Sequence, residues 1–127
     1  MGTLGTTVAV APNNEPLGGL MITQNNSLLT LTQVIGKSEL LIEIETVAQK
    51  YNISANKSIQ VAKSESSLNQ NAIGSAGEIG IYQFKIKTWA WMNSLRNTNL
   101  NINNVSHQID MYAWAIAHGY SIHWSTY

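Results

Sequence analysis

Residues 65–89 read ESSLNQNAIGSAGEIGIYQFKIKTW, and this run does most to restrict the architectures open to the chain. It begins with Glu65 at the end of a segment of helical periodicity. It continues through a loop with glycines at three-residue spacing from Gly74 to Gly80 and ends at the start of another helical segment. Glycine allows a tight turn or a close backbone approach. We therefore predict a helix, a long loop and a helix, with a carboxylate displayed where the first helix meets the loop.

Working outward, apolar residues recur at three- and four-residue spacing on both sides of this run, which is typical of amphipathic helices. Ser38 and Ser54 are predicted N-caps, and Gly119 is a predicted C-cap. Little of the sequence favours strand, so we predict a mainly α domain. The predicted helices cover about residues 39–51, 55–66, 85–95 and 105–118.

Residues 1–36 differ in character from the rest of the chain. They hold both prolines, Pro12 and Pro16, and two turn-prone asparagine pairs. Only residues 28–35 are apolar enough to pack, as a short strand or helix. We interpret residues 1–36 as an arm, linker or docking segment that could bind a protein partner, and residues 37–127 as the folded domain. A disordered leader is the alternative for the first segment.

The composition excludes several classes of function. Seven basic and seven acidic residues give no net charge, and no basic stripe appears, which disfavours nucleic acid as a partner. The chain has no cysteine, so thiolate catalysis, disulfides and cysteine metal sites are excluded. No apolar run reaches the ~18 residues of a membrane span. The run at residues 6–11 is too short for a signal-peptide core, and no signal peptide is visible.

Glu65 is the candidate catalytic residue. A glutamate on a helix is ordinarily a solvated surface charge. Glu65, however, lies three residues after Ala62 and six after Ile59, at the edge of the predicted buried stripe. Partial burial raises the pKa of a carboxyl group. A carboxyl that stays protonated near neutral pH can donate a proton to a glycosidic oxygen.

The segment after the glycine loop suits a sugar ligand. The loop lacks the Gly-Lys-Ser/Thr of a phosphate-binding loop. Gln83 lies between Tyr82 and Phe84, and an amide between aromatic rings can serve both the hydroxyls and the apolar faces of a sugar. A position in the core is the alternative for the two rings. We predict no cofactor and no metal, because His107 and His118 are about three helical turns apart.

Three blocks together resemble the soluble lytic transglycosylases of the lysozyme-like superfamily. They are residues 65–72, with the Glu-Ser pair, residues 77–84, with Gly-x-x-Gln-Phe, and Thr88–Trp89. The C-terminal end, including Trp124, is also similar to the resuscitation-promoting-factor branch. The resemblance covers about residues 40–127. It implies a lysozyme-like helical domain with a loop-rich substrate cleft.

The resemblance also implies a function and roles for particular residues. The expected substrate is peptidoglycan, cut between N-acetylmuramic acid and N-acetylglucosamine in the cell envelope or outside the cell. Glu65 would act as the single catalytic acid and then base, with Ser66 beside it. Tyr82 and Gln83 would contact the glycan, and Ser66, which supports the acid, is included with them among the predicted substrate-binding residues. The expected product is a 1,6-anhydro sugar.

One family motif is missing, which leaves alternatives open. The Ala-Tyr-Asn motif has Ala115-Ile116-Ala117 as its nearest counterpart, so its tyrosine is absent. Tyr120 or Tyr112 is a candidate replacement, and Tyr120 is included among the predicted substrate-binding residues. One alternative function is a hydrolytic lysozyme that uses Glu65 with Glu78. The other is a non-catalytic component of a cell wall or virion that keeps the lysozyme-like fold.

Overall fold

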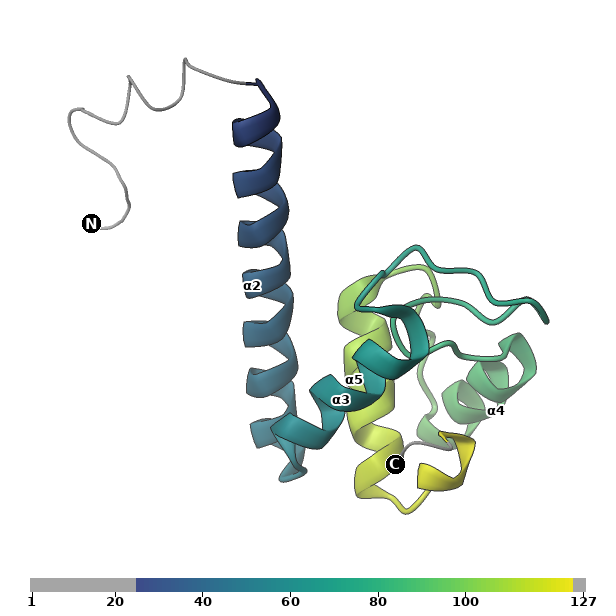
Figure 1. Ribbon diagram of the computed structural model, residues 1–127. Helices are drawn as coiled ribbons and strands as arrows, with labels where there is room; N and C mark the ends of the chain where they lie inside the picture. Colours follow the sequence, from purple (N-terminus) through teal and green to yellow (C-terminus); the bar gives the residue numbers. More distant parts are fainter. Residues whose placement is uncertain (1–24, 125–127) are drawn as a thin grey trace. The chain divides into compact units, whose positions relative to one another are not determined.

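The structure is a computed structural model that describes residues 25–124, with side chains from residue 36 onward. Its elements, shown in Figure 1, are α2 (Asn25–Tyr51), α3 (Ala55–Ser66), α4 (Ile86–Arg96), α5 (Val105–Ala117) and the 3-10 helix η1 (Ser121–His123). Across the described residues the only strand-like pairing is a pair of isolated bridges in the loop between α3 and α4. The prediction of a mainly α domain is confirmed, and α3, α4 and α5 begin and end close to the predicted residues.

The start of the first long helix differs from the prediction. The chain divides into two compact units, Met1–Ser38 and Glu39–Tyr127, and α2 continues across the boundary. Ser38 is therefore an exposed residue inside a helix, and its prediction as an N-cap is wrong. Gly36 is the weakest helix former nearby, and one interior glycine costs only about 1 kcal/mol. The predicted arm is helical from residue 25, while residues 1–24 lie outside the described part of the chain.

The other predicted caps occur where α3 begins and where α5 ends. The Ser54 side chain accepts a hydrogen bond from the Lys57 backbone N–H, as predicted for an N-cap. Gly119 follows the C-cap residue His118 and has a φ of +88°, and its N–H donates to the Ile116 carbonyl. This left-handed residue lets the chain leave α5 sharply. The helix thus ends one residue earlier than predicted, and Gly119 is the residue after the C-cap.

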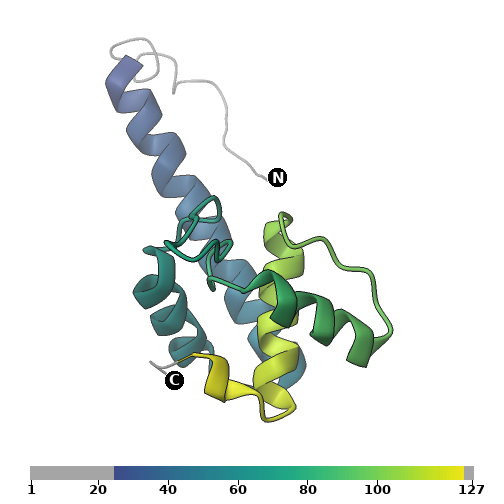
Figure 2. The ribbon, with the colours of Figure 1, turned by 90° about the vertical axis from the view of Figure 1, so that its right-hand side faces the viewer.

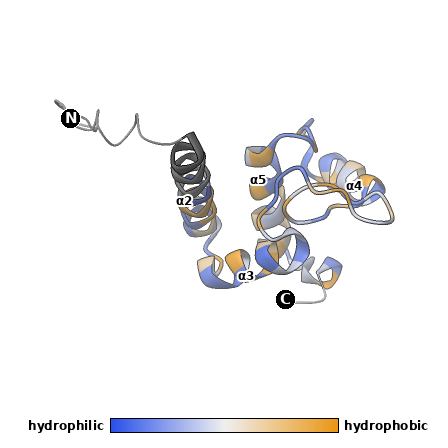
Figure 3. Ribbon diagram, turned by 45° about the horizontal axis from the view of Figure 1, so that its top comes forward, coloured by the Kyte–Doolittle hydropathy of each residue, from blue (hydrophilic) through white to orange (hydrophobic). Residues whose placement is uncertain are grey.

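The helix that contributes the most buried residues to the core is α5, which lies beside α4 (Figure 2). Hydrophobic (orange) and hydrophilic (blue) residues follow one another along α5 in Figure 3, and six residues of this helix are buried: Gln108, Ile109, Met111, Tyr112, Ala113 and Ala115. Tyr112 of α5 stacks on Tyr82 with ring centroids 3.8 Å apart. Trp89 of α4 is buried, as expected, and its indole N–H donates to the Leu100 carbonyl at 2.9 Å. The core therefore joins α5 to α4 and to the segment that follows the glycine loop.

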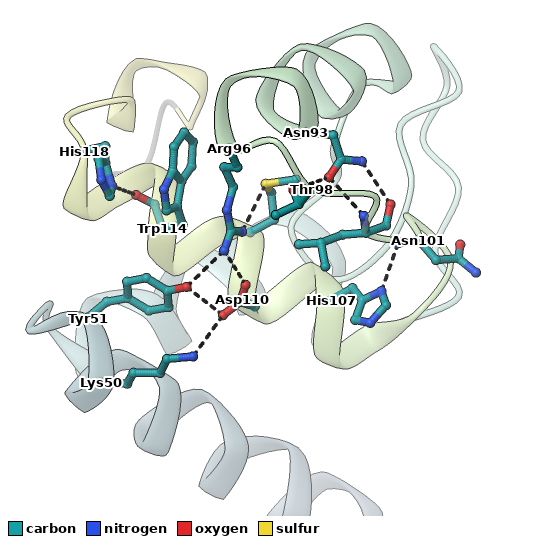
Figure 4. A network of polar contacts seen from close by, with 12 residues as sticks. Lys50, Tyr51, Asn93, Arg96, Thr98, Asn101, His107, Asp110, Trp114 and His118 are labelled. Carbon is teal, nitrogen blue, oxygen red and sulfur yellow. Dashed lines mark hydrogen bonds and ion pairs between the residues drawn. The ribbon is translucent and has the colours of Figure 1, made fainter.

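A charged network joins the last turns of α2 and α4 to the middle of α5 (Figure 4). Arg96 donates to the Asp110 carboxylate at 2.9 Å, and the Tyr51 hydroxyl donates to the same carboxylate at 2.8 Å. Lys50 lies 3.7 Å from Asp110, and the Arg96 guanidinium also lies over the Trp114 ring. These contacts fix the helix ends that support the second unit.

The Asp110 network predicts a pH-dependent contribution to stability. Burial alone would raise the pKa of Asp110, but hydrogen bonds from Tyr51 and Arg96 and the charges of Arg96 and Lys50 together lower it. The stabilisation is therefore present above the unfolded-state pKa and is lost as pH falls through the lower folded-state pKa. Asp110→Asn should reduce the free energy of unfolding by about 1–3 kcal/mol at neutral pH, with a difference that shrinks toward pH 3.

Urea unfolding at pH 7 and pH 3 measures this difference. Glu45→Gln is the matched control, because Glu45 is an exposed carboxylate on the same helix as Tyr51. An Asp110→Asn variant that is equally destabilised at both pH values would contradict the assignment.

Candidate active site

Glu65 lies in the last turn of α3, where the chain makes an abrupt exit from the helix. The next residues after the helix, Ser67 and Leu68, have φ angles of 55° and 64°. Two successive non-glycine residues in the left-handed region cost on the order of 1–3 kcal/mol each. Such strain is concentrated at functional sites more often than elsewhere, and here it directly follows the candidate acid.

The Glu65 side chain is half-buried, as its place at the edge of the apolar stripe predicted. Burial raises the pKa of its carboxyl, and the negative charge of Glu78 raises it further. Both causes disfavour the ionised form, so the proton is held to higher pH than on an ordinary glutamate. This is the protonation state that a general acid requires.

Glu65 lines a cleft of about 570 Å³, a volume typical of ligand-binding sites. The cleft brings together the α3 end, the glycine loop, the start of α4 and the C-terminal segment. Its lining residues are Glu65, Gly74, Ser75, Glu78, Gln83, Phe84, Lys85, Thr88, Ile122, His123 and Trp124. Two predicted site residues, Glu65 and Gln83, therefore share one cleft.

The glycine loop forms part of the cleft wall through Gly74, Ser75 and Glu78. The Gly74 N–H donates to the Glu78 carbonyl at 2.8 Å, and the Glu78 carboxylate accepts from the Ala76 N–H at 3.0 Å. A side chain at Gly74 would collide with the Glu78 carboxylate and the Gln83 amide oxygen. Gly74 thus leaves room for these two oxygen-bearing groups to approach each other over the loop backbone.

Gln83 is held in an unusual backbone conformation, with a φ of 51°. Its amide nitrogen donates to the Gly80 carbonyl at 2.9 Å and to the Ala72 carbonyl at 3.2 Å. Because both amide hydrogens are used by the loop, the amide oxygen is the atom left to accept a hydrogen bond from a ligand hydroxyl. The loop therefore fixes Gln83 in place before any ligand binds.

A family model for the transglycosylase SLT domain matches residues 43–122, which include the whole α3–loop–α4 region. The chain belongs to the transglycosylase SLT domain family. The resemblance seen in the sequence is thereby confirmed, and the mainly helical structure is consistent with a lysozyme-like SLT domain. No curated protein and no solved structure shows significant similarity to the chain.

Membership of the family supports a transglycosylase-type action on peptidoglycan. Proteins with an SLT domain typically act in the periplasm or outside the cell. In the described part of this chain, no helix has the length and apolar character needed to cross a membrane. Among the same residues, no group of three or more His, Cys, Asp or Glu side chains is arranged to hold a metal ion.

Ser66 of this SLT domain lies behind the cleft and does not line it. Its hydroxyl lies 2.8 Å from the Ile81 carbonyl oxygen and 3.2 Å from the Ala62 carbonyl oxygen, and it accepts a hydrogen bond from the Asn69 N–H at 3.1 Å. These contacts join the end of α3 to both flanks of the loop. The Ser66 side chain therefore holds the backbone at the end of α3, next to Glu65.

The other two predicted substrate-binding residues lie away from the cleft. Tyr82 has no exposed surface, and its hydroxyl donates to the Ser58 carbonyl at 3.1 Å. Tyr120 is half-buried and packs against Trp91 and Trp114. The full burial of Tyr82 leaves no surface for a glycan, which corrects the prediction for this residue, whereas a role of Tyr120 in substrate binding stays a prediction. The burial of Tyr82 could not be inferred from its position next to Gln83, because the left-handed backbone at Gln83 interrupts the regular alternation of side chains.

Replacing Tyr82 tests this assignment. Tyr82→Phe keeps the ring stack on Tyr112 but removes the hydrogen bond to Ser58. We expect the free energy of unfolding to fall by about 1 kcal/mol, with no change in affinity for glycan fragments. Thermal unfolding and calorimetric titration measure the two quantities. Weakened glycan binding at unchanged stability would instead restore Tyr82 to the binding surface.

The cleft of the SLT domain is also lined by residues that lie outside the three sequence blocks of residues 65–89. His123 and Trp124 line the cleft from the C-terminal segment, far along the chain from Glu65. The Trp124 indole donates to the Tyr82 carbonyl at 2.8 Å, and its ring packs edge-on against Phe84 and Tyr112. No local pattern marks such residues, because only the tertiary fold brings the segment to the cleft.

Proposed function

We propose that this SLT domain cleaves peptidoglycan between N-acetylmuramic acid and N-acetylglucosamine, with Glu65 as acid and then base. The observation that carries the proposal is the half-buried Glu65, with a raised carboxyl pKa, in an open cleft that also holds Gln83. The expected place of action is the cell envelope or the exterior of the cell.

The reaction follows from the position of a single acid. The protonated Glu65 carboxyl donates its proton to the glycosidic oxygen as the bond to the muramic acid C1 breaks. The positive charge that develops at C1 is shared with the acetamido group of the same sugar. The Glu65 carboxylate then takes the proton of the C6 hydroxyl, whose oxygen bonds to C1. The products are a free hydroxyl on the leaving sugar and a 1,6-anhydro end, and no water is consumed.

The residues around Glu65 have separate tasks in this proposal. The Gln83 amide oxygen accepts a hydrogen bond from a glycan hydroxyl. Ser66 holds the α3 end against the Ile81 backbone and so fixes the Glu65 side chain. Trp124 and Phe84 form an apolar wall that limits the access of water to one side of the cleft.

Hydrolysis is the second candidate, because Glu78 lines the same cleft and interacts electrostatically with Glu65. Most glycoside hydrolases use two carboxyl groups that flank the glycosidic bond. Glu78 would then place and activate a water molecule. Burial and the negative charge of Glu78 both raise the pKa of the Glu65 carboxyl, which favours the protonated form of this acid.

Mass spectrometry of the products separates the two reactions. Purified peptidoglycan digested by the wild-type protein should yield muropeptides with 1,6-anhydro ends. Glu78→Gln should retain most of that activity, because the transglycosylase route needs only Glu65. Reducing ends in the wild-type digest, together with inactivity of Glu78→Gln, would establish hydrolysis in its place.

A further inference from the structure

A row of large side chains lies on α4 and at the end of α5, and several of its members reach the surface. Trp91 of α4 is 44% exposed, and its ring lies edge-on to Tyr120 at 5.2 Å. Tyr120 stacks on Trp114 at 5.7 Å, and Trp114 stacks on His118 at 4.6 Å. Leu95 is 50% exposed and lies one helical turn after Trp91. These five residues are called the aromatic surface below.

The rings of the aromatic surface are held in place by the protein itself. The Arg96 guanidinium lies over the Trp114 ring at 5.2 Å, and His118 Nδ1 lies 2.8 Å from the Trp114 carbonyl oxygen, as Figure 4 shows for these three residues. Because the rings are already ordered, little conformational entropy is lost when a partner packs on them. Tryptophan and tyrosine are also among the residues that contribute most to the energy of protein interfaces.

The part of the chain that carries the aromatic surface has an excess of positive charge. Residues 85–124 contain three lysine or arginine residues and a single acid, Asp110, which is paired with Arg96 and Lys50. Lys87 is exposed and lies one helical turn before Trp91 on α4. A partner that complements this surface therefore presents an apolar side chain together with carboxylates.

The exposed side of α2 carries that combination of side chains. Ile42 is 60% exposed and lies two residues before the buried Ile44, so it is on the opposite side of the helix from the core. Glu39 and Glu45 are exposed and lie three residues before and after Ile42, so both flank it on one helix face. Among the side chains of residues 36–124, both ion pairs involve Asp110, so neither glutamate takes part in one. Glu39, Ile42 and Glu45 are called the acidic face below.

We propose that the aromatic surface of one copy of this chain binds the acidic face of a second copy. Ile42 packs against Trp91 and Leu95, and a flanking glutamate pairs with Lys87. The two surfaces differ, so the contact is head-to-tail, and a dimer keeps one aromatic surface and one acidic face open to further copies. A single helix face is smaller than a permanent interface, so we expect weak association that becomes detectable at about 0.1–1 mM. The inference goes beyond the proposed function and does not depend on it.

Sedimentation velocity of two variants, each with one surface blocked, tests the head-to-tail contact. Ile42→Asp places a charge in the acidic face, and Leu95→Asp places one in the aromatic surface, so each variant alone should stay monomeric. An equimolar mixture should form a heterodimer and nothing larger, because one compatible pair of surfaces remains. Formation of the heterodimer also shows that both variants are folded. Ile86→Asp is the matched control, because Ile86 is 61% exposed on α4 outside the aromatic surface, and it should associate like the wild type.

The charged part of the contact is tested by salt and by a lysine variant. Added salt should weaken association of the wild-type protein, because the pairing charges are exposed. Lys87→Gln should weaken association about two- to fivefold and reduce its salt dependence. Lys63→Gln, which removes an exposed lysine of α3, is the control and should behave like the wild type.

Three results would refute the proposal. One is a wild-type protein that stays monomeric up to about 1 mM. Another is an equimolar mixture of Ile42→Asp and Leu95→Asp that contains only monomers. The third is association of either blocked variant alone as tight as that of the wild type, because such oligomers would use other surfaces. If Lys87→Gln associates like Lys63→Gln at every salt concentration, the glutamate–Lys87 pairing is wrong.

Discussion

Glu65→Gln should reduce the release of soluble muropeptides from purified peptidoglycan by about 10²–10⁴-fold, the range typical of a lost general acid. Glutamine has nearly the same shape as glutamic acid, so the cleft and its contacts remain. It cannot donate a proton to the glycosidic oxygen or take one from the C6 hydroxyl. Glu45→Gln, on the exposed surface of α2, is the matched control and should keep wild-type activity.

The same variant should not be destabilised, which distinguishes lost chemistry from lost folding. The Glu65 pKa is raised by burial and by Glu78, so its ionisation opposes folding. Its favourable contribution is therefore complete below the unfolded-state pKa and is lost as pH rises through the folded-state pKa. Glu65→Gln removes this penalty. Its free energy of unfolding at neutral pH should match or exceed the wild-type value.

Two results would overturn the catalytic assignment. Wild-type turnover by Glu65→Gln would show that another residue supplies the proton. Glycan binding without release of any product by the wild-type protein would favour the alternative of a non-catalytic cell-wall or virion component. Muropeptide release and thermal unfolding on the same preparations decide among these outcomes.

Gly80→Ala should be the most destabilising of the substitutions considered, with a loss of about 3 kcal/mol or more in the free energy of unfolding. Gly80 has a φ of +88°, which strains any residue with a Cβ atom. An added methyl group would also collide with the amide of Gln108. That side chain is fully buried, accepts a hydrogen bond from the Ile81 N–H and donates one to the Ile102 carbonyl. It has no room to move aside without leaving buried polar groups unpaired.

Gly77→Ala is the matched control for the backbone term. Gly77 has a similar φ of +84°, but an added Cβ would meet nothing within 4 Å. Its expected cost is only the strain of about 1–2 kcal/mol. Chemical denaturation compares the two variants. Equal destabilisation would show that strain alone governs this loop and that contact with Gln108 contributes nothing. Because Gly80 lies in the loop that holds Gln83, glycan affinity should also fall in Gly80→Ala.

Much of the fold could be predicted because α3, α4 and α5 carry their own periodic patterns and end signals. Ser54 and Gly119 act within a few residues of where they stand, so their effects can be inferred locally. Ser38 has the same local chemistry as Ser54 but lies inside α2, because helical residues continue on both sides of it. A capping residue marks a helix start only when the preceding segment is not itself helical.

The candidate site divides in a similar way. Glu65 and Gln83 were accessible from sequence because the order and spacing of their short motifs are specific to the family. The placements of Tyr82 and Tyr120 could not be predicted, because the sequence does not show whether an aromatic ring near a site residue faces the core or the ligand. The contributions of His123 and Trp124 were also hidden, since no short-range pattern relates them to residues 65–89.

The sequence by itself thus determined the helical class, the family and the identity of the candidate acid, because these depend on periodicity and on motifs separated by few residues. Only the tertiary structure decided what surrounds that acid. Left-handed residues at Gly80 and Gln83 turn the loop so that Tyr82 enters the core and Gln83 reaches the cleft. The C-terminal segment then packs on Tyr82 through Trp124 and supplies the opposite wall. The apolar stripe of α3 predicted the partial burial of Glu65. The charge of Glu78, which raises the Glu65 pKa further, acts on the acid only because the folded loop brings the two carboxyl groups into one cleft, and local sequence patterns do not encode that approach.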